Sequence, residues 1–326
     1  MSEPDLAPAP EAPIGIFDSG IGGLSVLRHV HALLPDEELL YFADSGFAPY
    51  GEKPEQVIVE RVLAIAEFLL RLKVKAIVVA CNTATAAAIA ALRERYPQLQ
   101  VVGVEPGLKP AAALTASGKV GVLATAGTLG SDKFLKLRQQ VTDATQVEFL
   151  LQPCNGLANQ IEKGELSSRE TVQLVQRYVA PLVAQQADTL VLGCTHYPFV
   201  EHLVRDVAGQ IVRIVDTGEP VARQLERQMG LAPGPIPATP AAAVSLCLEI
   251  LGAAAARPLK GVTVTAAPGF LASAALEPKA ALERSLSDME SPPARSAGPA
   301  AWPAAAAFRC NSMCTSSTLA LCQPGA

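Results

Sequence analysis

Short apolar runs alternate with longer amphipathic stretches over residues 14–229 of this 326-residue chain. The runs are rich in Val, Ile and Leu, and clear examples are residues 14–17 and 76–79. Between the runs, apolar positions recur at helical spacing, as they do over residues 54–73. Strands that alternate with helices indicate parallel sheets covered by helices. We therefore predict an α/β fold.

The apolar runs repeat in one order, which predicts two related halves. Four runs of the first half return later in the chain with nearly the same offset. The matched pairs are 14–18 with 120–124, 39–42 with 147–150, 76–79 with 189–192, and 101–107 with 212–218. This period is longer than that of solenoid repeats, so it indicates a duplicated α/β unit.

Two cysteines stand directly after apolar runs that the repeat pairs with each other. Cys81 lies in Ala80-Cys81-Asn82-Thr83, and Cys194 lies in Gly193-Cys194-Thr195-His196. In duplicated halves, the two thiols would face each other across one cleft. Because a thiol at the start of a helix is favoured as its thiolate, we predict a matched pair of acid/base groups.

Other polar residues at these strand ends could assist the thiols. Asp18 ends the first run, and the glycines at positions 20, 22 and 23 permit close approach of the backbone. Their spacing differs from that of dinucleotide sites and phosphate-binding loops, so no nucleotide cofactor is indicated. His196, two residues beyond Cys194, could hydrogen-bond the thiol or a substrate.

Two other roles of the cysteines remain open at this point. A zinc site could use Cys81, Cys194 and His196, but no fourth ligand stands at a recognisable spacing. A disulfide would remove both bases, and the chain shows no cysteine spacing typical of a disulfide framework. We favour the acid/base pair, with no metal. The remaining cysteines are interpreted as packing or tail residues: Cys154, Cys247, Cys310, Cys314 and Cys322.

Composition narrows the possible partners. The net charge of −5, without a block of Lys or Arg, argues against nucleic acid. No uninterrupted apolar run reaches the length of a membrane span, so we expect no membrane association. Residues 1–13 are acidic and proline-rich, which predicts a disordered extension rather than a signal peptide, and we expect a cytoplasmic protein. Residues 258–326 are rich in Ala, Pro and Ser and are expected to form a poorly ordered tail.

Five segments between residues 14 and 230 resemble those of the glutamate racemase family, in that family's order. They are Gly15-Ile16-Phe17-Asp18-Ser19-Gly20-Ile21-Gly22-Gly23-Leu24, Pro49-Tyr50-Gly51, Ala80-Cys81-Asn82-Thr83-Ala84-Thr85, Gly103-Val104-Glu105-Pro106 and Gly193-Cys194-Thr195-His196-Tyr197-Pro198. The resemblance implies an isomerase that interconverts L- and D-glutamate without a cofactor and supplies D-glutamate for peptidoglycan. We also expect a homodimer.

The resemblance further implies a role for individual residues. Cys194 would deprotonate L-glutamate and Cys81 would deprotonate D-glutamate, from opposite faces of the α-carbon. Asp18 and His196 would assist the cysteines, and Glu162 would be a further acidic group near the site. The implied substrate contacts are Asp18, Ser19, Tyr50, Gly51, Asn82, Thr83, Thr195 and His196, with Thr125 and Thr128 as additional expected contacts.

The same resemblance implies two pseudo-symmetric flavodoxin-like domains with the active site in the cleft between them. The expected first domain comprises residues 14–99 plus 208–257, and the second comprises residues 100–207. The fourth strand of each half would then lie in the opposite domain. Two alternative functions remain: a racemase of aspartate or a related amino acid, and a non-catalytic ligand-binding protein on this fold.

Overall fold

The first sheet contains five parallel strands in the order β4-β3-β1-β2-β9. The structure is a computed structural model, and it describes residues 11–230 and 262–266. The strands of this sheet are β1 Ile14–Asp18, β2 Leu39–Ala43, β3 Ala76–Val79, β4 Gln100–Gly103 and β9 Val262–Ala266. Because Ile14 lies opposite both Leu39 and Ala76, the carboxyl ends of β1, β2 and β3 meet at one edge.

The second sheet repeats this arrangement with four parallel strands in the order β6-β5-β7-β8. Its strands are β5 Lys119–Ala124, β6 Glu148–Pro153, β7 Thr189–Gly193 and β8 Arg213–Val215. The order β4-β3-β1-β2 in the first sheet corresponds strand for strand to β8-β7-β5-β6 in the second. The prediction of an α/β protein with two related parallel sheets is therefore confirmed.

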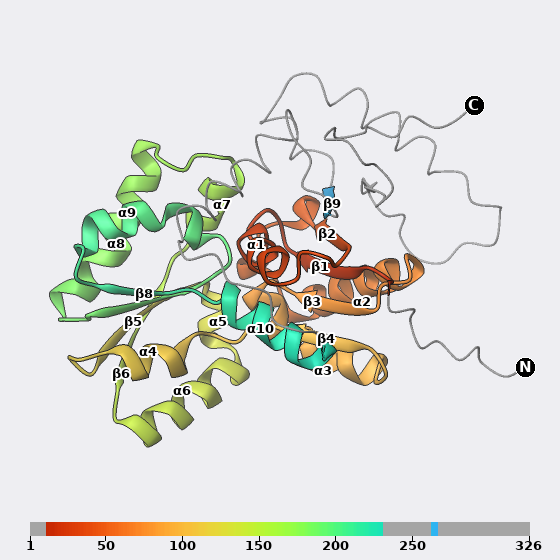
Figure 1. Cartoon of the computed structure of the whole chain (residues 1–326). Coiled ribbons are helices and arrows are strands. Elements are labelled where there is room, and N and C mark those ends of the chain that lie inside the picture. The colour runs from red at the N-terminus through yellow and green to blue at the C-terminus, as the bar shows by residue number, and fades with distance from the viewer. Residues whose placement is uncertain (1–10, 231–261, 267–326) are drawn as a thin grey trace, which may run out of the picture.

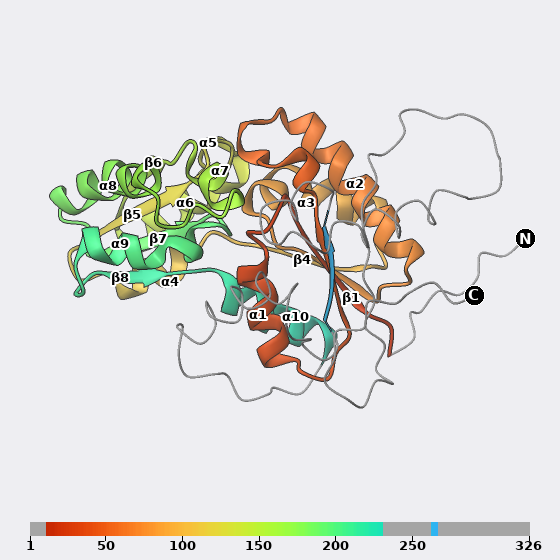
Figure 2. The ribbon, with the colours of Figure 1, turned by 90° about the horizontal axis from the view of Figure 1, so that it is seen from above.

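Helices connect the parallel strands, as parallel pairing requires. They are α1 Leu24–Leu33, α2 Glu55–Arg71, α3 Asn82–Arg95, α4 Leu108–Leu114, α5 Ala126–Gly130, α6 Asp132–Thr145, α7 Leu157–Glu162, α8 Arg169–Ala184, α9 Glu201–Ala208 and α10 Gly218–Met229, with short 3₁₀ helices η1 Ser45–Phe47, η2 Tyr50–Glu52 and η3 Tyr197–Val200. Figure 1 shows the two sheets side by side, each among its own helices. In Figure 2, α10 returns from the second sheet and packs along α1 of the first.

Both faces of the first sheet are buried, which explains its nearly continuous apolar runs. Along β1, Ile16 packs into an apolar cluster with Val30 of α1, whereas Phe17 packs into a second cluster with Val62 of α2. The first cluster continues to Leu190 of β7 and so joins the two halves. Burying one such side chain stabilises the fold by about 1.5–3 kcal/mol. Polar residues are consequently concentrated beyond the ends of the strands.

Two strands lie on the other side of the expected domain boundaries. β4 pairs with β3 in the first sheet, and β8 pairs with β7 in the second, whereas the expected division placed each in the opposite domain. The chain reaches β4 through α3 and β8 through α9, and a helix between parallel strands returns the chain to the same sheet. The chain therefore crosses between the sheets after β4 and after β8. The complete division into domains stays a prediction.

The expected poorly ordered tail includes a strand. β9 pairs in parallel with β2, with Val262 opposite Leu39. The expectation that most of the tail is poorly ordered stays a prediction. Val262–Ala266 begins with four consecutive β-branched residues, which is typical of a strand, although the composition around it indicates low complexity. Residues 1–10 and the rest of the tail lie outside the described residues. Among the helices that the structure describes, none has the length and apolar character needed to cross a membrane.

Candidate active site

The polar residues predicted from the two halves meet beyond the carboxyl ends of the central strands. Asp18 ends β1, Cys81 follows β3, and Cys194 follows β7. All three side chains are buried. Ligands of open parallel sheets bind beyond these strand ends, where the connections leave the sheet. The duplicated fold thus brings one cysteine from each sheet into one site.

Cys81 lies at the amino end of a long helix. It is the N-cap residue of α3, and its Sγ accepts a hydrogen bond of 3.4 Å from the N–H of Ala84. Its thiol also lies 3.9 Å from Oγ of Ser19, to which it can donate. Burial, followed by the charge of Asp18, raises the pKa of Cys81 well above 9.0. Cys81 is therefore held as a thiol with its proton available for donation.

Cys194 instead lies beside an imidazole. Its Sγ is 3.6 Å from Nδ1 of His196, and Nε2 of His196 is 2.5 Å from Oε1 of Glu162. Burial alone lowers the pKa of His196, but the hydrogen bonds to Cys194 and Glu162 outweigh burial and raise that pKa well above 6.5. Glu162 is itself held by the N–H of Ile21, which donates to Oε1 at 2.8 Å. The result is a thiol, imidazole and carboxylate in series.

Asp18 connects the first half of the chain to the second. One of its carboxylate oxygens accepts from the N–H of Gly20 at 3.0 Å, and the other accepts from the hydroxyl of Thr195 at 3.1 Å. Burial raises the pKa of this carboxyl above 3.8, against the opposing charge of His196. Because Thr195 belongs to the second half, this hydrogen bond also fixes the two halves relative to each other.

The glycine-rich segment is explained by this close approach of the halves. A Cβ at Gly20 would lie 1.9 Å from Oε1 of Glu162, and a Cβ at Gly22 would lie 2.4 Å from Nδ1 of His196. No side chain fits at either position while Glu162 and His196 stay in place. The spacing of the glycines is thus set by packing against the second half, which the sequence pattern did not reveal.

Hydroxyl and amide groups complete the site. The hydroxyl of Thr83 lies 3.0 Å from that of Thr125 and 3.3 Å from that of Thr128, which joins α3 to α5 across the two halves. Asn82 is buried, yet neither its amide nitrogen nor its amide oxygen has a hydrogen-bond partner among the described residues. A buried polar group without a partner is costly, so Asn82 is available to bind a polar ligand.

Tyr50 and Gly51 reach the site from the loop after β2. The hydroxyl of Tyr50 donates to Asp44 at 2.5 Å, and a Cβ at Gly51 would lie 2.7 Å from Cβ of Thr125. The first and second halves are therefore in contact here as well. Contacts between the two halves involve Asp18, Gly51, Thr83, Thr125, Thr128, Glu162, Thr195 and His196. The other predicted residues lie within two positions of these along the chain: Ser19, Tyr50, Cys81, Asn82 and Cys194.

Comparison with known proteins places the chain in a family. A sequence model described as Asp/Glu/Hydantoin racemase matches residues 14–225. The chain belongs to this racemase family. Its relatives include the glutamate racemase of Ectopseudomonas mendocina, 57% identical over 220 residues, which are 68% of this chain and 83% of the relative. The glutamate racemase of Methylococcus capsulatus is 56% identical over 219 residues, which are 67% of this chain and 80% of the relative.

Solved structures of the family share the fold. Escherichia coli glutamate racemase, in complex with L-glutamate and the activator UDP-MurNAc-ala, superposes with a TM-score of 0.63 at 33% identity. The superposition covers 73% of this chain and 95% of that chain. Glutamate racemase RacE1 from Bacillus anthracis superposes with a TM-score of 0.62 at 33% identity, over 68% of this chain and 83% of that chain. The resemblance of the five sequence segments to this family is thus confirmed.

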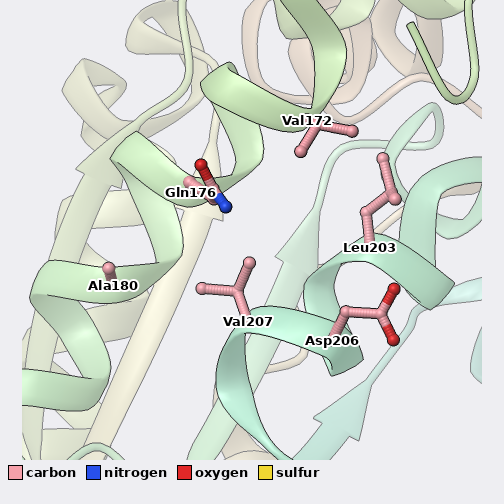
Figure 3. A pocket seen from close by; sticks show the side chains of 6 residues that line it. All are labelled: Val172, Gln176, Ala180, Leu203, Asp206 and Val207. Carbon is pink, nitrogen blue, oxygen red and sulfur yellow. The ribbon is translucent and has the colours of Figure 1, made fainter. Parts of the chain in front are cut away.

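Three further features concern Cys154, metal binding and a pocket away from the two thiols. Cys154 is buried, and its backbone oxygen accepts from the hydroxyl of Tyr197 at 3.4 Å. In the part of the chain that the structure describes, no group of three or more His, Cys, Asp or Glu side chains is arranged to hold a metal ion. A pocket between α8 and α9 contains none of the predicted site residues (Figure 3). It is lined by Val172, Gln176, Ala180, Leu203, Asp206 and Val207.

Proposed function

We propose that the protein interconverts L- and D-glutamate without a cofactor, by means of two cysteine bases. The observation that carries this proposal is the pair of buried thiols, Cys81 and Cys194, supplied to one site by two related sheets. After burial and the charge of Asp18, negative charge on Cys194 also raises the pKa of Cys81, which supports a site shared by both cysteines. Relatives more than half identical are glutamate racemases, and a solved family member holds L-glutamate.

The two cysteines would exchange roles in each turnover. With L-glutamate bound, the Cys194 thiolate takes the proton from the α-carbon, and the electron pair of the broken C–H bond stays on that carbon. The Cys81 thiol then delivers its proton to the opposite face, which forms D-glutamate. Cys194 ends as a thiol and Cys81 as a thiolate, so the enzyme is ready for D-glutamate. Proton transfer to or from solvent restores the starting state.

The unequal surroundings of the thiols support this order. A protonated imidazole beside a thiol stabilises the thiolate, and the raised pKa of His196 keeps its imidazole protonated above pH 6.5. Glu162 orients His196 through Nε2, in the same manner that a carboxylate orients a catalytic histidine in other enzymes. On the other side, burial keeps Cys81 as the proton donor.

Stabilisation of charge on the α-carbon and its carboxylate would come from the surrounding polar groups. Proton transfer to positioned bases contributes only about 10²–10⁴-fold to a rate. Preorganised hydrogen-bond donors in a site closed to water supply much of the remainder. Asn82, whose amide has no partner among the described residues, and the hydroxyls of Ser19, Thr83 and Thr195 are the groups we assign to this role.

The biological role follows from the product. D-Glutamate would serve peptidoglycan synthesis, the role that the family implies. A homodimer and a cytoplasmic location stay predictions. Light scattering of the purified protein would measure its molar mass in solution and so test the dimer. Racemisation by the expected residues needs no metal, so activity should persist in excess chelator.

A chiral assay tests the proposed function. Purified full-length protein is incubated with L-glutamate, and in parallel with L-aspartate, while the D-isomer is quantified by chiral chromatography. The expected result is conversion of glutamate to an equal mixture of isomers, because enantiomers have equal free energies. The double variant Cys81→Ser/Cys194→Ser controls for contaminating racemases. Conversion of aspartate alone, or of neither amino acid, would refute the proposal and favour one of the alternative functions.

A further inference from the structure

An ion pair outside the predicted site holds the loop that carries Tyr50. Asp44 directly follows β2 and is almost fully buried. One of its oxygens accepts from the hydroxyl of Tyr50 at 2.5 Å and from Nε of Arg61 at 3.0 Å. The other oxygen accepts from Nη2 of Arg61 at 2.5 Å. This two-point geometry is the strongest form of ion pair between Arg and a carboxylate.

Arg61 also contacts the middle of the same loop. Its guanidinium lies 3.8 Å from the centre of the Phe47 ring, so one side chain of α2 contacts the loop at both Asp44 and Phe47. Burial lowers the pKa of Arg61, but the hydrogen bond and charge of Asp44 outweigh that effect and raise it. The guanidinium of Arg61 therefore stays charged at any ordinary pH.

The hydroxyl of Tyr50 is committed to this pair. Burial, and then the charge of Asp44, raise the pKa of Tyr50, so the hydroxyl keeps its proton and donates it to Asp44. The backbone of Tyr50 and Gly51 is then the part of the loop left to meet a substrate. That backbone lies against the second half, because a Cβ at Gly127 would be 3.1 Å from the carbonyl oxygen of Gly51.

We propose that Asp44 and Arg61 are positioning residues that hold the backbone of Tyr50 and Gly51 against Thr125 for substrate binding. The inference rests on the proposed function, and it assigns to that site two residues that the sequence pattern did not single out. A buried ion pair is a poor means of stabilising a fold, because desolvation offsets most of its attraction. The two-point contact between Asp44 and Arg61 instead fixes the position of the loop. That position would determine how tightly the substrate binds.

Arg61→Lys is the primary test, with Arg71→Lys as the matched control on the same helix. Lysine keeps the charge but cannot form the two-point contact or stack on Phe47. Arg71 is exposed and pairs only with Glu67 in the described structure, at 3.6 Å. We expect Arg61→Lys to raise KM about tenfold for both enantiomers while kcat changes less than about threefold, because lost uniform binding appears in KM. Arg71→Lys should match the wild type.

Tyr50→Phe and the double variant Arg61→Lys/Tyr50→Phe show whether the effect passes through the loop. Tyr50→Phe keeps the ring and removes the hydrogen bond to Asp44, so KM should rise here too. Because both changes release the same loop, KM of the double variant should rise by less than the product of the single effects. Circular dichroism and Tm establish that each variant is folded.

Two outcomes would overturn the inference. One is a folded Arg61→Lys protein with a lowered Tm and KM within about twofold of the wild type, which would show a purely structural role. The other is a double variant whose single effects multiply, which would show that Arg61 does not act through Tyr50. Failure of the wild type to racemise glutamate would instead refute the proposed function, and calorimetric binding of glutamate to the same variants would still test the positioning role.

Discussion

The two thiols occupy equivalent places in the duplicated fold but have different surroundings. Cys81 caps α3 and has only the hydroxyl of Ser19 and the N–H of Ala84 as hydrogen-bond partners among the described residues. Cys194 lies 3.6 Å from His196, which Glu162 holds from its other side. The two related sheets therefore place the thiols equivalently, as a two-base racemase needs, whereas the hydrogen-bonding neighbours of each thiol differ.

This difference does not make the enzyme faster in one direction. Enantiomers have equal free energies, so kcat/KM must be the same for L- and D-glutamate in every variant. The asymmetry between the thiols can appear only in kcat and KM separately, in isotope effects, and in partial reactions such as exchange with solvent. The following predictions use these measurements.

Replacing either thiol should have the largest effect. Cys81→Ser and Cys194→Ser should each lower kcat/KM about 10²–10⁴-fold, because a serine hydroxyl is a far weaker acid than a thiol. Cys154→Ser is the matched control, since Cys154 is a buried cysteine whose thiol donates to the backbone oxygen of Gln152. It should keep most of its activity in a chiral assay. Strong loss in the control would mean that serine disturbs any buried cysteine position here.

Removing the imidazole should have an intermediate and asymmetric effect. His196→Gln should lower kcat/KM about 10–10²-fold in both directions, because Cys194 loses its charged partner. The step at Cys194 then limits the rate, so α-deuterated L-glutamate should show a larger isotope effect than α-deuterated D-glutamate. His202→Gln, at an exposed position where the ring contacts Ser167, is the control. Equal isotope effects in His196→Gln would remove the distinction between the thiols.

Much of this comparison could be predicted from the sequence. The repeated apolar runs predicted both sheets. Cys81 and Cys194 follow corresponding strands of the two halves, and this position predicted that the two thiols would lie in one site. The contact of His196 with Glu162 joins residues 34 positions apart and has no local pattern, so family resemblance indicated only that Glu162 lies near the site. Asp44 follows β2 as Asp18 ends β1, but no local pattern indicates that it pairs with Arg61 of α2.

Chemical modification should show a smaller difference between the thiols. Iodoacetamide should label Cys194 several-fold faster than Cys81 near neutral pH, because the thiolate is the reactive form. Since the pKa of Cys81 is raised above 9.0, its labelling should still increase beyond that pH. Mass spectrometry of the peptides distinguishes the sites. In His196→Gln the ratio of Cys194 labelling to Cys81 labelling should fall, because Cys194 loses the imidazole that stabilises its thiolate. An unchanged ratio would assign the difference to access rather than to the imidazole.

The smallest expected effect concerns stability. The pKa of His196 is raised in the folded state, so its contribution is fully present below the unfolded value of 6.5 and is lost as pH rises through the folded pKa. The Tm of the wild type should therefore exceed that of His196→Gln by more at about pH 6 than at about pH 10. Thermal scans in buffers of equal ionic strength provide the comparison. A difference that grows with pH would show that the imidazole is neutral in the folded protein.

Exchange of the α-hydrogen with solvent deuterium tests the two-base account most directly. Each single variant is incubated in D₂O with L- or D-glutamate, and nuclear magnetic resonance follows loss of the α-proton while chiral chromatography follows inversion. Cys81→Ser should exchange L-glutamate faster than D-glutamate without inverting it, because Cys194 remains to remove and return the hydrogen. Cys194→Ser should show the opposite preference. Substantial racemisation by either variant, or a reversed preference, would contradict the account.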